Sequence, residues 1–244
     1  MSASTLLPVE IKNLACYFGR KVVLRSVDLR IDGGEIVALL GANGSGKTTL
    51  FSLLVGLLQP NSGERCFAGK VAHEIGPDLR TQIAYVAHAP QLYPLLSALE
   101  NLELFASLRG EDPKQAGARA SEVLTALGLE ESTHDRAVSC YSRGMAQRVV
   151  LARAIVHSPA LLLLDEPFTA LDRGGRAVLA EQLREERKRG AGILLSTHDV
   201  DGISQVADRA VLLENGVIIG ETRREERSSA LFRDEILALG HGKS

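Results

Sequence analysis

A glycine-rich stretch followed by lysine and threonine is the first segment whose residue types and spacing predict chemistry. It fits the pattern G-x-x-x-x-G-K-[ST] and comprises Gly41, Ala42, Asn43, Gly44, Ser45, Gly46, Lys47, Thr48 and Thr49. Glycine adopts backbone conformations closed to other residues, so successive N–H groups can turn inward around phosphate oxygens. Lys47 adds a positive charge at the β- and γ-phosphates, and Thr48 offers a hydroxyl to Mg²⁺. The stretch therefore predicts a phosphate-binding loop.

The segments on either side of this stretch have the patterns that such a loop requires. The apolar residues 36–40 precede it as a candidate strand, and residues 47–57 follow it as a candidate helix. The positive end of that helix would point at the bound anion. A glycine-rich turn without a ligand is the alternative, but it would not need the lysine and threonine.

Two carboxylates follow a second short apolar run. Residues 161–164 are all leucine, and Asp165 and Glu166 come directly after them. Mg²⁺ prefers oxygen ligands, so Asp165, at the tip of a buried strand, is predicted to hold the metal. Side chains alternate along a strand, so Glu166 is predicted to face the γ-phosphate and to activate the attacking water. The alternative is a pair of acids that cap the next helix.

Three further segments narrow the choice among nucleotide-binding proteins. They are Ser139–Arg148, Ala170–Asp172 and Ser196–Asp199. A phosphate-binding loop alone fits GTPases, kinases and many ATPases, but this order of segments resembles the ATP-binding subunits of ABC transporters over about residues 9–221. The resemblance implies an α/β fold, that of a P-loop NTPase with a RecA-like parallel-sheet core, an antiparallel β subdomain and an inserted α-helical signature subdomain. It also implies ATP hydrolysis with Mg²⁺.

The resemblance places one segment of this chain against a partner's nucleotide. The signature-loop position at the start of a helix is occupied by Ser142, Arg143, Gly144 and Met145. Ser142 and the Gly144 amide would contact the γ-phosphate of ATP held by the opposite subunit, because a helix N-terminus binds anions. One subunit then supplies half of each active site. This implies a homodimer or pseudo-dimer of ATPase subunits.

Three other positions take roles from the same resemblance. Asp172, in the D-loop position, would link the two active sites across the dimer. His198, in the switch position, would hydrogen-bond the γ-phosphate and help to hold Glu166 and the water. Phe18 matches the aromatic residue that stacks on adenine, with Tyr17 as the alternative, since stacking requires only a flat ring.

Two positions depart from the family pattern. Arg143 replaces the first glycine of the common Leu-Ser-Gly-Gly-Gln signature, and His88 occupies the glutamine-loop position, with Gln91 as the competing choice. Imidazole is a poor Mg²⁺ ligand, so His88 is expected to hydrogen-bond the water shell instead. Together with the segment Ser142–Met145, His88 makes the chain similar to the ATP-binding subunits of haem exporters that serve cytochrome c maturation. Related ABC-2-type exporters share parts of this pattern.

The elements that must position these residues follow from the hydrophobic patterns. An antiparallel β layer is predicted at about residues 9–14, 22–31 and 65–67. A parallel sheet buried on both faces is predicted at residues 36–40, 83–86, 161–164, 193–196 and 210–213. Helices are predicted at about residues 98–108, 114–128 and 146–157. A packed terminal helix is predicted from Leu231, Ile236, Leu237 and Leu239.

Length and composition favour one soluble domain. With 244 residues, of which 45% are hydrophobic, we expect a single ABC ATPase domain over 1–244, with a helical subdomain at about 95–157 and a helical tail at about 222–244. No stretch approaches the ~20 apolar residues that span a bilayer, and the N-terminus lacks a secretion signal. Cys16, Cys66 and Cys140 give no disulfide pattern. We expect a peripheral protein on the cytoplasmic face of the inner membrane, attached through integral membrane transporter subunits.

The net charge of the chain and the resemblance together favour transport over binding to nucleic acid. A net charge of −2 argues against binding to nucleic acid, which depends on basic surface. The function expected from the resemblance is ATP-driven export of a solute through separate transmembrane subunits, with haem as the candidate cargo. The alternatives are an ABC-2-type exporter of another substrate and a related ATPase that acts on ribosomes or DNA. The last usually has two such domains or a long inserted arm, and this chain has neither.

Overall fold

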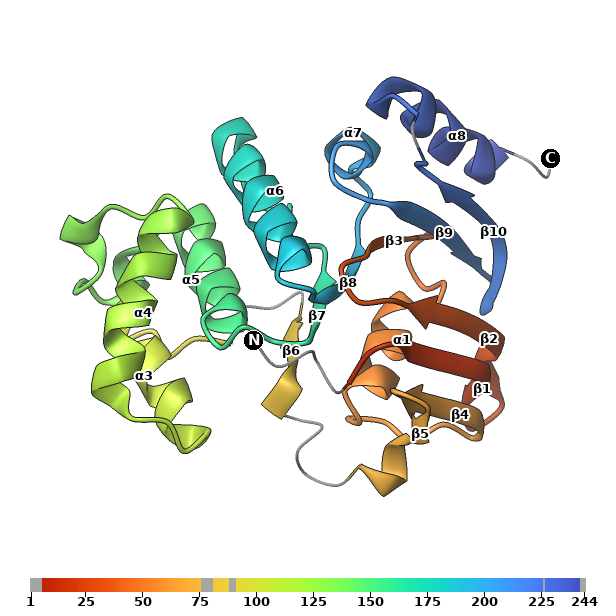
Figure 1. Cartoon of the computed structure of the whole chain (residues 1–244), viewed down its shortest axis with the longest axis horizontal. Helices are drawn as coiled ribbons and strands as arrows, with labels where there is room; N and C mark the ends of the chain where they lie inside the picture. Colours follow the sequence, from red (N-terminus) through yellow and green to blue (C-terminus); the bar gives the residue numbers. More distant parts are fainter. Residues whose placement is uncertain (1–5, 76–80, 88–90, 226, 242–244) are drawn as a thin grey trace.

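Two β-sheets form the framework of the molecule (Figure 1). The structure is a computed structural model that describes residues 6–75, 81–87, 91–225 and 227–241. The antiparallel sheet lies at one side, a group of helices lies at the other, and the larger sheet runs between them. This is the α/β architecture expected from the sequence, with its parallel core and antiparallel layer.

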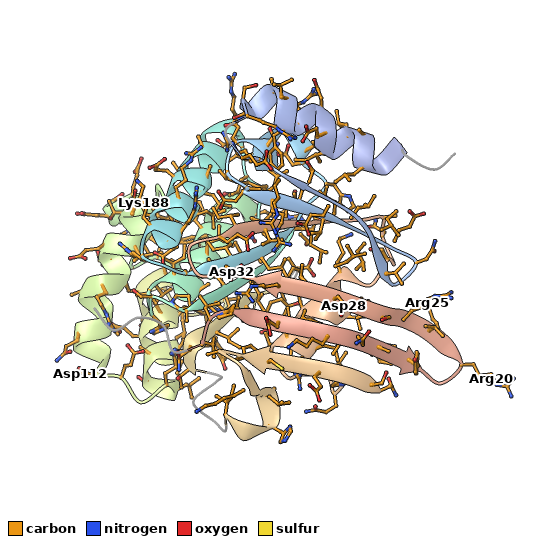
Figure 2. The ribbon with its side chains drawn as sticks, turned by 45° about the vertical axis from the view of Figure 1, so that its right-hand side comes forward. Arg20, Arg25, Asp28, Asp32, Asp112 and Lys188 are labelled. Atoms are coloured by element: carbon orange, nitrogen blue, oxygen red, sulfur yellow. The ribbon has the colours of Figure 1, made fainter. Side chains whose placement is uncertain are left out.

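The antiparallel sheet has the strand order β2-β1-β4-β5. Its strands are β1 (Val9–Phe18), β2 (Lys21–Ile31), β4 (Ser62–Phe67) and β5 (Lys70–Val71). Along β2 the apolar residues Leu24, Val27, Leu29 and Ile31 are buried and the residues between them are exposed, so one face packs on the core. Figure 2 shows Arg20 at the tip of the β1–β2 hairpin, pointing away from the rest of the molecule.

The larger sheet has the order β10-β9-β3-β8-β7-β6. Its strands are β3 (Ile36–Leu40), β6 (Ile83–Val86), β7 (Leu161–Asp165), β8 (Gly192–Ser196), β9 (Arg209–Glu214) and β10 (Val217–Arg223). All neighbours pair in parallel except β10, which is antiparallel to β9. Every residue of β3, β7 and β8 is buried, as expected for central parallel strands covered on both faces.

Side-chain alternation along β3 divides the apolar interior into two clusters. Ile36, Ala38 and Leu40 belong to a cluster shared with the helices. Val37 and Leu39 belong to a second cluster shared with the antiparallel sheet and the helix that follows β3. Burial of an aliphatic side chain of this size contributes about 1.5–3 kcal/mol. Strand β3 is therefore held on both faces, and it fixes the origin of the loop that begins at Gly41.

Seven helices surround the sheets in the described part of the chain. They are α1 (Lys47–Leu54), α3 (Ala98–Leu108), α4 (Pro113–Ala126), α5 (Arg143–Ile155), α6 (Arg173–Lys188), α7 (Val200–Ser204) and α8 (Ser229–His241). Helices α3, α4 and α5 pack on one another on the left in Figure 1, and α7 and α8 lie together near β9 and β10. Among the described residues, no helix combines the length and the apolar character that crossing a membrane requires.

Helix α3 shows how the sequence fixes the segment before it. Ser97 caps the helix and forms a capping box with Glu100, since each side chain accepts from the other residue's backbone N–H at 3.1 and 2.7 Å. The fully buried Asn101 side chain accepts from the Tyr93 N–H at 2.8 Å and donates to the Tyr93 carbonyl at 3.1 Å. The chain between Tyr93 and Ser97 is thereby tied to α3.

The C-terminal part of the chain differs from the sequence prediction. Strand β10 was not expected, and it occupies the start of the predicted helical tail, so that α8 begins only at Ser229. In α8 the buried residues are Phe232 and Ile236, whereas Leu231 is 58% exposed and Leu237 is 37% exposed. The prediction that Leu231 and Leu237 pack inward was wrong, because a helix that lies on a sheet edge buries only one narrow face.

Two helix boundaries also differ from the prediction. Helix α1 ends at Leu54 rather than near residue 57, because Gly56 takes a left-handed φ of 76° that stops the helix. Helix α5 begins at Arg143 rather than near residue 146, because Ser142 caps it by accepting from the Met145 N–H at 3.2 Å. The second difference brings the whole segment Arg143–Met145 into the first turn of the helix.

Candidate functional site

The loop between β3 and α1 is shaped by glycines that no other residue could replace without strain. Gly41 and Gly46 have φ values of 152° and 113°. A Cβ on Gly41 would overlap the Leu213 carbonyl oxygen, and a Cβ on Gly46 would lie 2.6 Å from Leu24 Cδ2. The loop is therefore pressed against β9 and β2, and its backbone N–H groups lead into the N-terminus of α1.

Lys47 lies in the concavity of this loop. Its ammonium donates to the carbonyls of Gly41 at 2.6 Å and Ala42 at 3.2 Å, and only 7% of the residue is exposed. Burial lowers the pKa of Lys47, and the carboxylates of Glu166 and Asp165 oppose that shift. A buried cation beside a cradle of glycines is suited to a phosphate group.

A hydroxyl and a carboxylate meet at the tips of α1 and β7. Thr48 Oγ1 donates to Asp165 Oδ2 at 2.8 Å, and Ser196 Oγ donates to Asp165 Oδ1 at 2.5 Å. Asp165 is 4% exposed, so its carboxylate depends on these two donors. It does not cap a helix, which removes the alternative interpretation of the acidic pair for this residue. The chemistry of these hard oxygen ligands fits Mg²⁺.

A magnesium ion at this position would take only part of its coordination sphere from the protein. Among the described residues, no group of three or more His, Cys, Asp or Glu side chains could hold a metal ion by itself. Mg²⁺ commonly uses one or two protein ligands and takes the rest from phosphate oxygens and water. The pair Thr48 and Asp165 fits that mode of binding, in which the metal enters with the nucleotide.

Glu166 combines a strained backbone with an unsatisfied carboxylate oxygen. Its φ of 55° is left-handed, and its N–H lies within hydrogen-bond distance of both oxygens of Ser196, at 3.0 and 3.2 Å. The Oε1 atom is buried and has no hydrogen-bond partner in the described structure, although His198 Nε2 lies 3.1 Å away. That Nε2 atom is aligned instead with Asn43 Oδ1 at 3.2 Å. This carboxylate oxygen thus keeps the capacity to accept a further hydrogen bond.

These residues line one cavity of about 1120 Å³, which is large enough for a nucleotide. Lys47, Thr48, Asp165, Glu166 and His198 all lie on its wall. The other lining residues are Phe18, Lys21, Val22, Val23, Asn43, Gly44, Gly46, Thr49, Phe168, Thr169, Arg176, Thr197 and Asp199. Phe18 is 51% exposed and lines the cavity, whereas Tyr17 does not.

Comparison with known proteins places the site in a family. The family model described as "ABC transporter" matches residues 24–169. The aliphatic sulfonates import ATP-binding protein SsuB 1 of Pseudomonas syringae is 42% identical over 95% of this chain and 83% of its own length. The chain belongs to the ABC transporter ATP-binding family. It is an ATPase cassette, as the resemblance in the sequence predicted.

Solved structures and other relatives agree with this assignment. A structure titled as the ATP-binding subunit of an ABC transporter has a TM-score of 0.83 and 32% identity, covering 96% of this chain and 99% of its own. The dimeric cassette MJ0796, in a post-hydrolysis state with ADP and phosphate, has a TM-score of 0.79 and 28% identity, over 88% of this chain and 98% of its own. The Bacillus subtilis linearmycin resistance protein LnrL is 29% identical over 95% of this chain and 74% of its own.

In this ABC cassette the signature segment lies apart from the nucleotide cavity. Ser142 and Arg143 are exposed at the N-terminus of α5, and neither lines the cavity that contains Lys47. The helix start is held by its own chain, since a Cβ on Gly144 would lie 3.0 Å from the Ala170 carbonyl and Gln147 donates to the Pro167 carbonyl at 3.5 Å. Within one chain the segment therefore lies outside the cavity that contains Lys47.

Asp172 is the N-cap of α6. Its Oδ1 accepts from the Gly175 N–H at 2.8 Å and lies 3.7 Å from Arg148 Nη2, which extends from α5. The side chain is 78% exposed. Asp172 thus fixes the start of α6 and still presents its carboxylate to the surface, which is where a contact with another subunit would have to form.

The glutamine-loop prediction falls partly outside the described structure. His88 lies outside the described residues, so the choice between His88 and Gln91 stays a prediction. Gln91 is exposed, and its carbonyl accepts from Arg153 of α5. Burial lowers the pKa of Arg153, which also lies over the Phe105 ring, 4.3 Å from the centroid. The backbone at Gln91 is therefore tied to the helical group.

Three residues at the site carried no separate prediction from the sequence. Ser196 was noted only as part of its segment, but its hydroxyl holds Asp165. Tyr85 faces the same region, and burial together with the Asp165 carboxylate raises its pKa to about 12. Arg176 lines the cavity from α6. Only strand pairing or a tertiary contact brings these side chains to the site, so no local pattern marks them.

Proposed function

We propose that this chain is the ATP-hydrolysing motor of a membrane transporter whose transmembrane subunits are separate chains. The observation that carries the proposal is the single cavity that combines three parts. A buried lysine lies in a glycine loop, a hydroxyl and carboxylate pair is suited to Mg²⁺, and a carboxylate with an unsatisfied oxygen lies beside His198. Enzymes that transfer a phosphoryl group to water use groups with these roles to bind phosphate, to hold Mg²⁺ and to position the water.

Each of these residues has a separate role in the proposed hydrolysis of ATP. Lys47 and the loop N–H groups hold the β- and γ-phosphates of ATP, and Phe18 stacks on the adenine. Thr48 and Asp165 hold Mg²⁺, which when bound neutralises charge on the β- and γ-phosphates. Glu166 accepts a proton from the attacking water. His198 donates from Nε2 to a γ-phosphate oxygen and stays close enough to Glu166 to keep its carboxylate in place.

A second cassette completes each site. Ser142 caps a helix of 13 residues, Gly144 lies in its first turn, and neither residue lines the cavity that contains Lys47 of the same chain. Closure of two chains head to tail would place the Ser142 loop of one against the ATP of the other. The dimeric state of MJ0796, a cassette of similar fold, supports this arrangement. Either two identical chains or a pseudo-dimer satisfies it.

The transmembrane partner and the location follow from the same proposal. The motor would lie peripherally on the cytoplasmic face of the inner membrane, bound to integral membrane subunits, and we expect no nucleic acid among its partners. The net charge of −2 supports this expectation, because nucleic acid binding depends on basic surface.

Two cargo classes compete. Export of haem for cytochrome c maturation is supported by the segment Ser142–Met145, with export of another solute by an ABC-2-type system as its close variant. Import of organic sulfonates is supported by the 42% identity to the sulfonate import protein SsuB 1. The nucleotide site is the same in each case, so the membrane subunits decide between them.

The test is to purify the Glu166→Gln variant from gently solubilised native membranes with Mg-ATP. Loss of the base should lower ATP hydrolysis by about a hundredfold or more while ATP binding persists, so the closed complex accumulates. We expect polytopic membrane subunits to co-purify. Haem absorption would support haem export, whereas sulfonate-stimulated ATPase activity of the wild-type complex would support import.

The matched control is Glu181→Gln, which makes the same change on the exposed surface of α6. It should hydrolyse ATP and bind its partners as the wild type does. Undiminished turnover by Glu166→Gln would remove this residue as the base. Recovery of ribosomes or DNA in place of membrane proteins would contradict the transport function and leave the ATPase alone.

A further inference from the structure

Arg176, one turn into α6, joins two segments that no other described side chain connects in this way. Its Nε donates to the Leu171 carbonyl at 3.2 Å, and its Nη1 donates to Asp199 Oδ2 at 2.8 Å. Leu171 directly precedes Asp172 of the D-loop, and Asp199 directly follows His198. One planar guanidinium therefore holds the backbone before one functional residue and the side chain after another.

Asp199, in the switch segment, is held by several hydrogen bonds. Its Oδ1 accepts from the Gly202 N–H at 3.0 Å and caps α7, and its own N–H donates to Thr197 Oγ1 at 2.9 Å. The remaining carboxylate oxygen, Oδ2, accepts from Arg176. The backbone on both sides of His198 is thus fixed through Asp199, and the position of the imidazole depends on where Arg176 holds that carboxylate.

We propose that Arg176 is a positioning residue that couples the D-loop to the switch histidine. A displacement of Leu171 and Asp172, such as a second cassette would cause on closing against the exposed Asp172, is transmitted through the guanidinium to Asp199 and hence to His198. The inference rests on the proposed hydrolysis of ATP at this site. It adds a route by which the chain senses a partner through its own D-loop.

The alternative role for Arg176 is a direct contact with phosphate, since its side chain also lines the cavity. The hydrogen bonds favour positioning, because the Nε and Nη1 groups are both engaged with acceptors of the protein itself. Lys47 already supplies the cation inside the glycine loop. The two roles differ in what they change, because positioning acts on kcat and a phosphate contact acts on ATP affinity.

The experiment compares Arg176→Ala and Arg176→Lys with a matched control, Arg184→Ala. Arg184 lies two turns further along α6, has the same charge, and donates to the Gln205 carbonyl at the other end of α7. We expect Arg176→Ala to lower kcat about tenfold with an unchanged Kd for ATP, since coupling residues commonly change activity by this order. Arg176→Lys should be intermediate, because a single ammonium lacks the fork that reaches both acceptors. Arg184→Ala should match the wild type.

Two further measurements test whether a lower kcat in Arg176→Ala comes from the lost contact with Asp199. In a double-mutant cycle, Asp199→Asn should lower kcat in the wild type but add little in Arg176→Ala, because the shared contact is already lost. By hydrogen exchange, which needs no turnover, the amides of Asp199 and Gly202 should exchange about tenfold faster in Arg176→Ala than in Arg184→Ala.

Each outcome decides the question. Wild-type kcat and wild-type exchange in Arg176→Ala would overturn the coupling. A raised Kd with unchanged kcat would overturn it in favour of a phosphate contact. If the wild-type chain hydrolyses no ATP, the proposed function fails, while the exchange of Asp199 and Gly202 still shows whether Arg176 holds the switch segment.

Discussion

At the scale of single residues, the geometry around Asp165 depends on a serine from the neighbouring strand. Ser196 Oγ donates to Asp165 Oδ1, and the same hydroxyl lies 3.0 Å from the Glu166 N–H. One side chain thus contacts both the carboxylate that we propose to hold Mg²⁺ and the backbone of the proposed base. Outer groups of this kind are often as important as the ligands that they hold.

Ser196→Ala should therefore weaken Mg²⁺ binding more than it affects the fold. With one donor to Asp165 lost, we expect the Mg²⁺ concentration for half-maximal ATPase activity to rise about ten- to a hundredfold, the usual effect of removing such a partner. Titration of Mg²⁺ at saturating ATP measures it. Ser204→Ala, which removes another buried serine hydroxyl that donates to the Asp201 carbonyl, should leave the titration unchanged. An unshifted curve for Ser196→Ala would contradict this role.

The sequence indicated those candidate site residues that occur together in one continuous segment at a fixed spacing. The glycine loop with Lys47 and Thr48, and the acidic pair after the leucine run, are continuous in the chain and need no knowledge of the fold. Arg176 and Ser196 could not be found this way. Their roles come from contacts across 23 and 31 residues of sequence, to Asp199 and Asp165, which only the folded chain creates.

At the scale of elements, the ends of α3 and α5 are joined by a group of titratable side chains around His157. His157 follows α5, and its Nδ1 lies 2.7 Å from Glu111 Oε1 in the loop between α3 and α4. Arg119 of α4 pairs with the same carboxylate, and Arg109 at the end of α3 donates to the Thr81 carbonyl just before β6. The helical group is thus tied to the central sheet at the base of β6.

This group predicts a loss of stability in mild acid. Burial, with the Arg109 charge as the second cause, lowers the pKa of His157 below its ordinary value of 6.5, against the opposing effect of Glu111. Below about pH 6.5 the unfolded chain takes up the proton first, so stability present at neutral pH is lost as the pH falls toward the lower folded pKa. Urea unfolding at neutral pH and at about pH 5.5 should show this decrease.

The control for this prediction replaces each of two histidines with glutamine. His157→Gln should show a smaller decrease between the two pH values, whereas His73→Gln, at an exposed position, should behave as the wild type. An equal decrease in His157→Gln would mean that another group causes it. Glu111 acts in a different range, because its carboxylate is protonated only at lower pH.

The sequence predicted the positions of helices and strands more reliably than the residues at which they begin and end. The five central strands were correct because short continuous apolar runs are typical of strands in a sheet covered on both faces. Strand β10 was missed because its apolar run ends after Ile219, and Gly220 and Glu221 are residue types that are depleted in strands. Helix α5 begins earlier than predicted because a single serine cap decides its start.

At the scale of the whole molecule, the residues proposed to form the site lie in two separate places. Lys47 and Glu166 line the cavity, while Ser142 and Asp172 are exposed outside it. In the proposed dimer, these two sets of residues would come together only between one chain and a second copy or a related cassette.

This division predicts complementation between inactive variants. Lys47→Ala should lose ATP binding and Ser142→Arg should block the contact in trans, so neither homodimer has a complete site. An equal mixture should recover about a quarter of wild-type activity, since half of the dimers are mixed and each of these has one complete site of two. ATPase activity after mixing measures it, with the unmixed variants as controls. No recovery, with mixed dimers verified by size and mass, would contradict sharing of the sites.

The left-handed backbone at Glu166 has a consequence for protein engineering. A residue with a side chain held at a φ of 55° costs about 1 kcal/mol or more relative to relaxed conformations, and glycine would avoid most of that cost. A screen for thermostable variants of this cassette would therefore tend to select replacements of its proposed base. Stability and turnover are in conflict at this one position, so improved heat resistance has to be sought elsewhere in the chain.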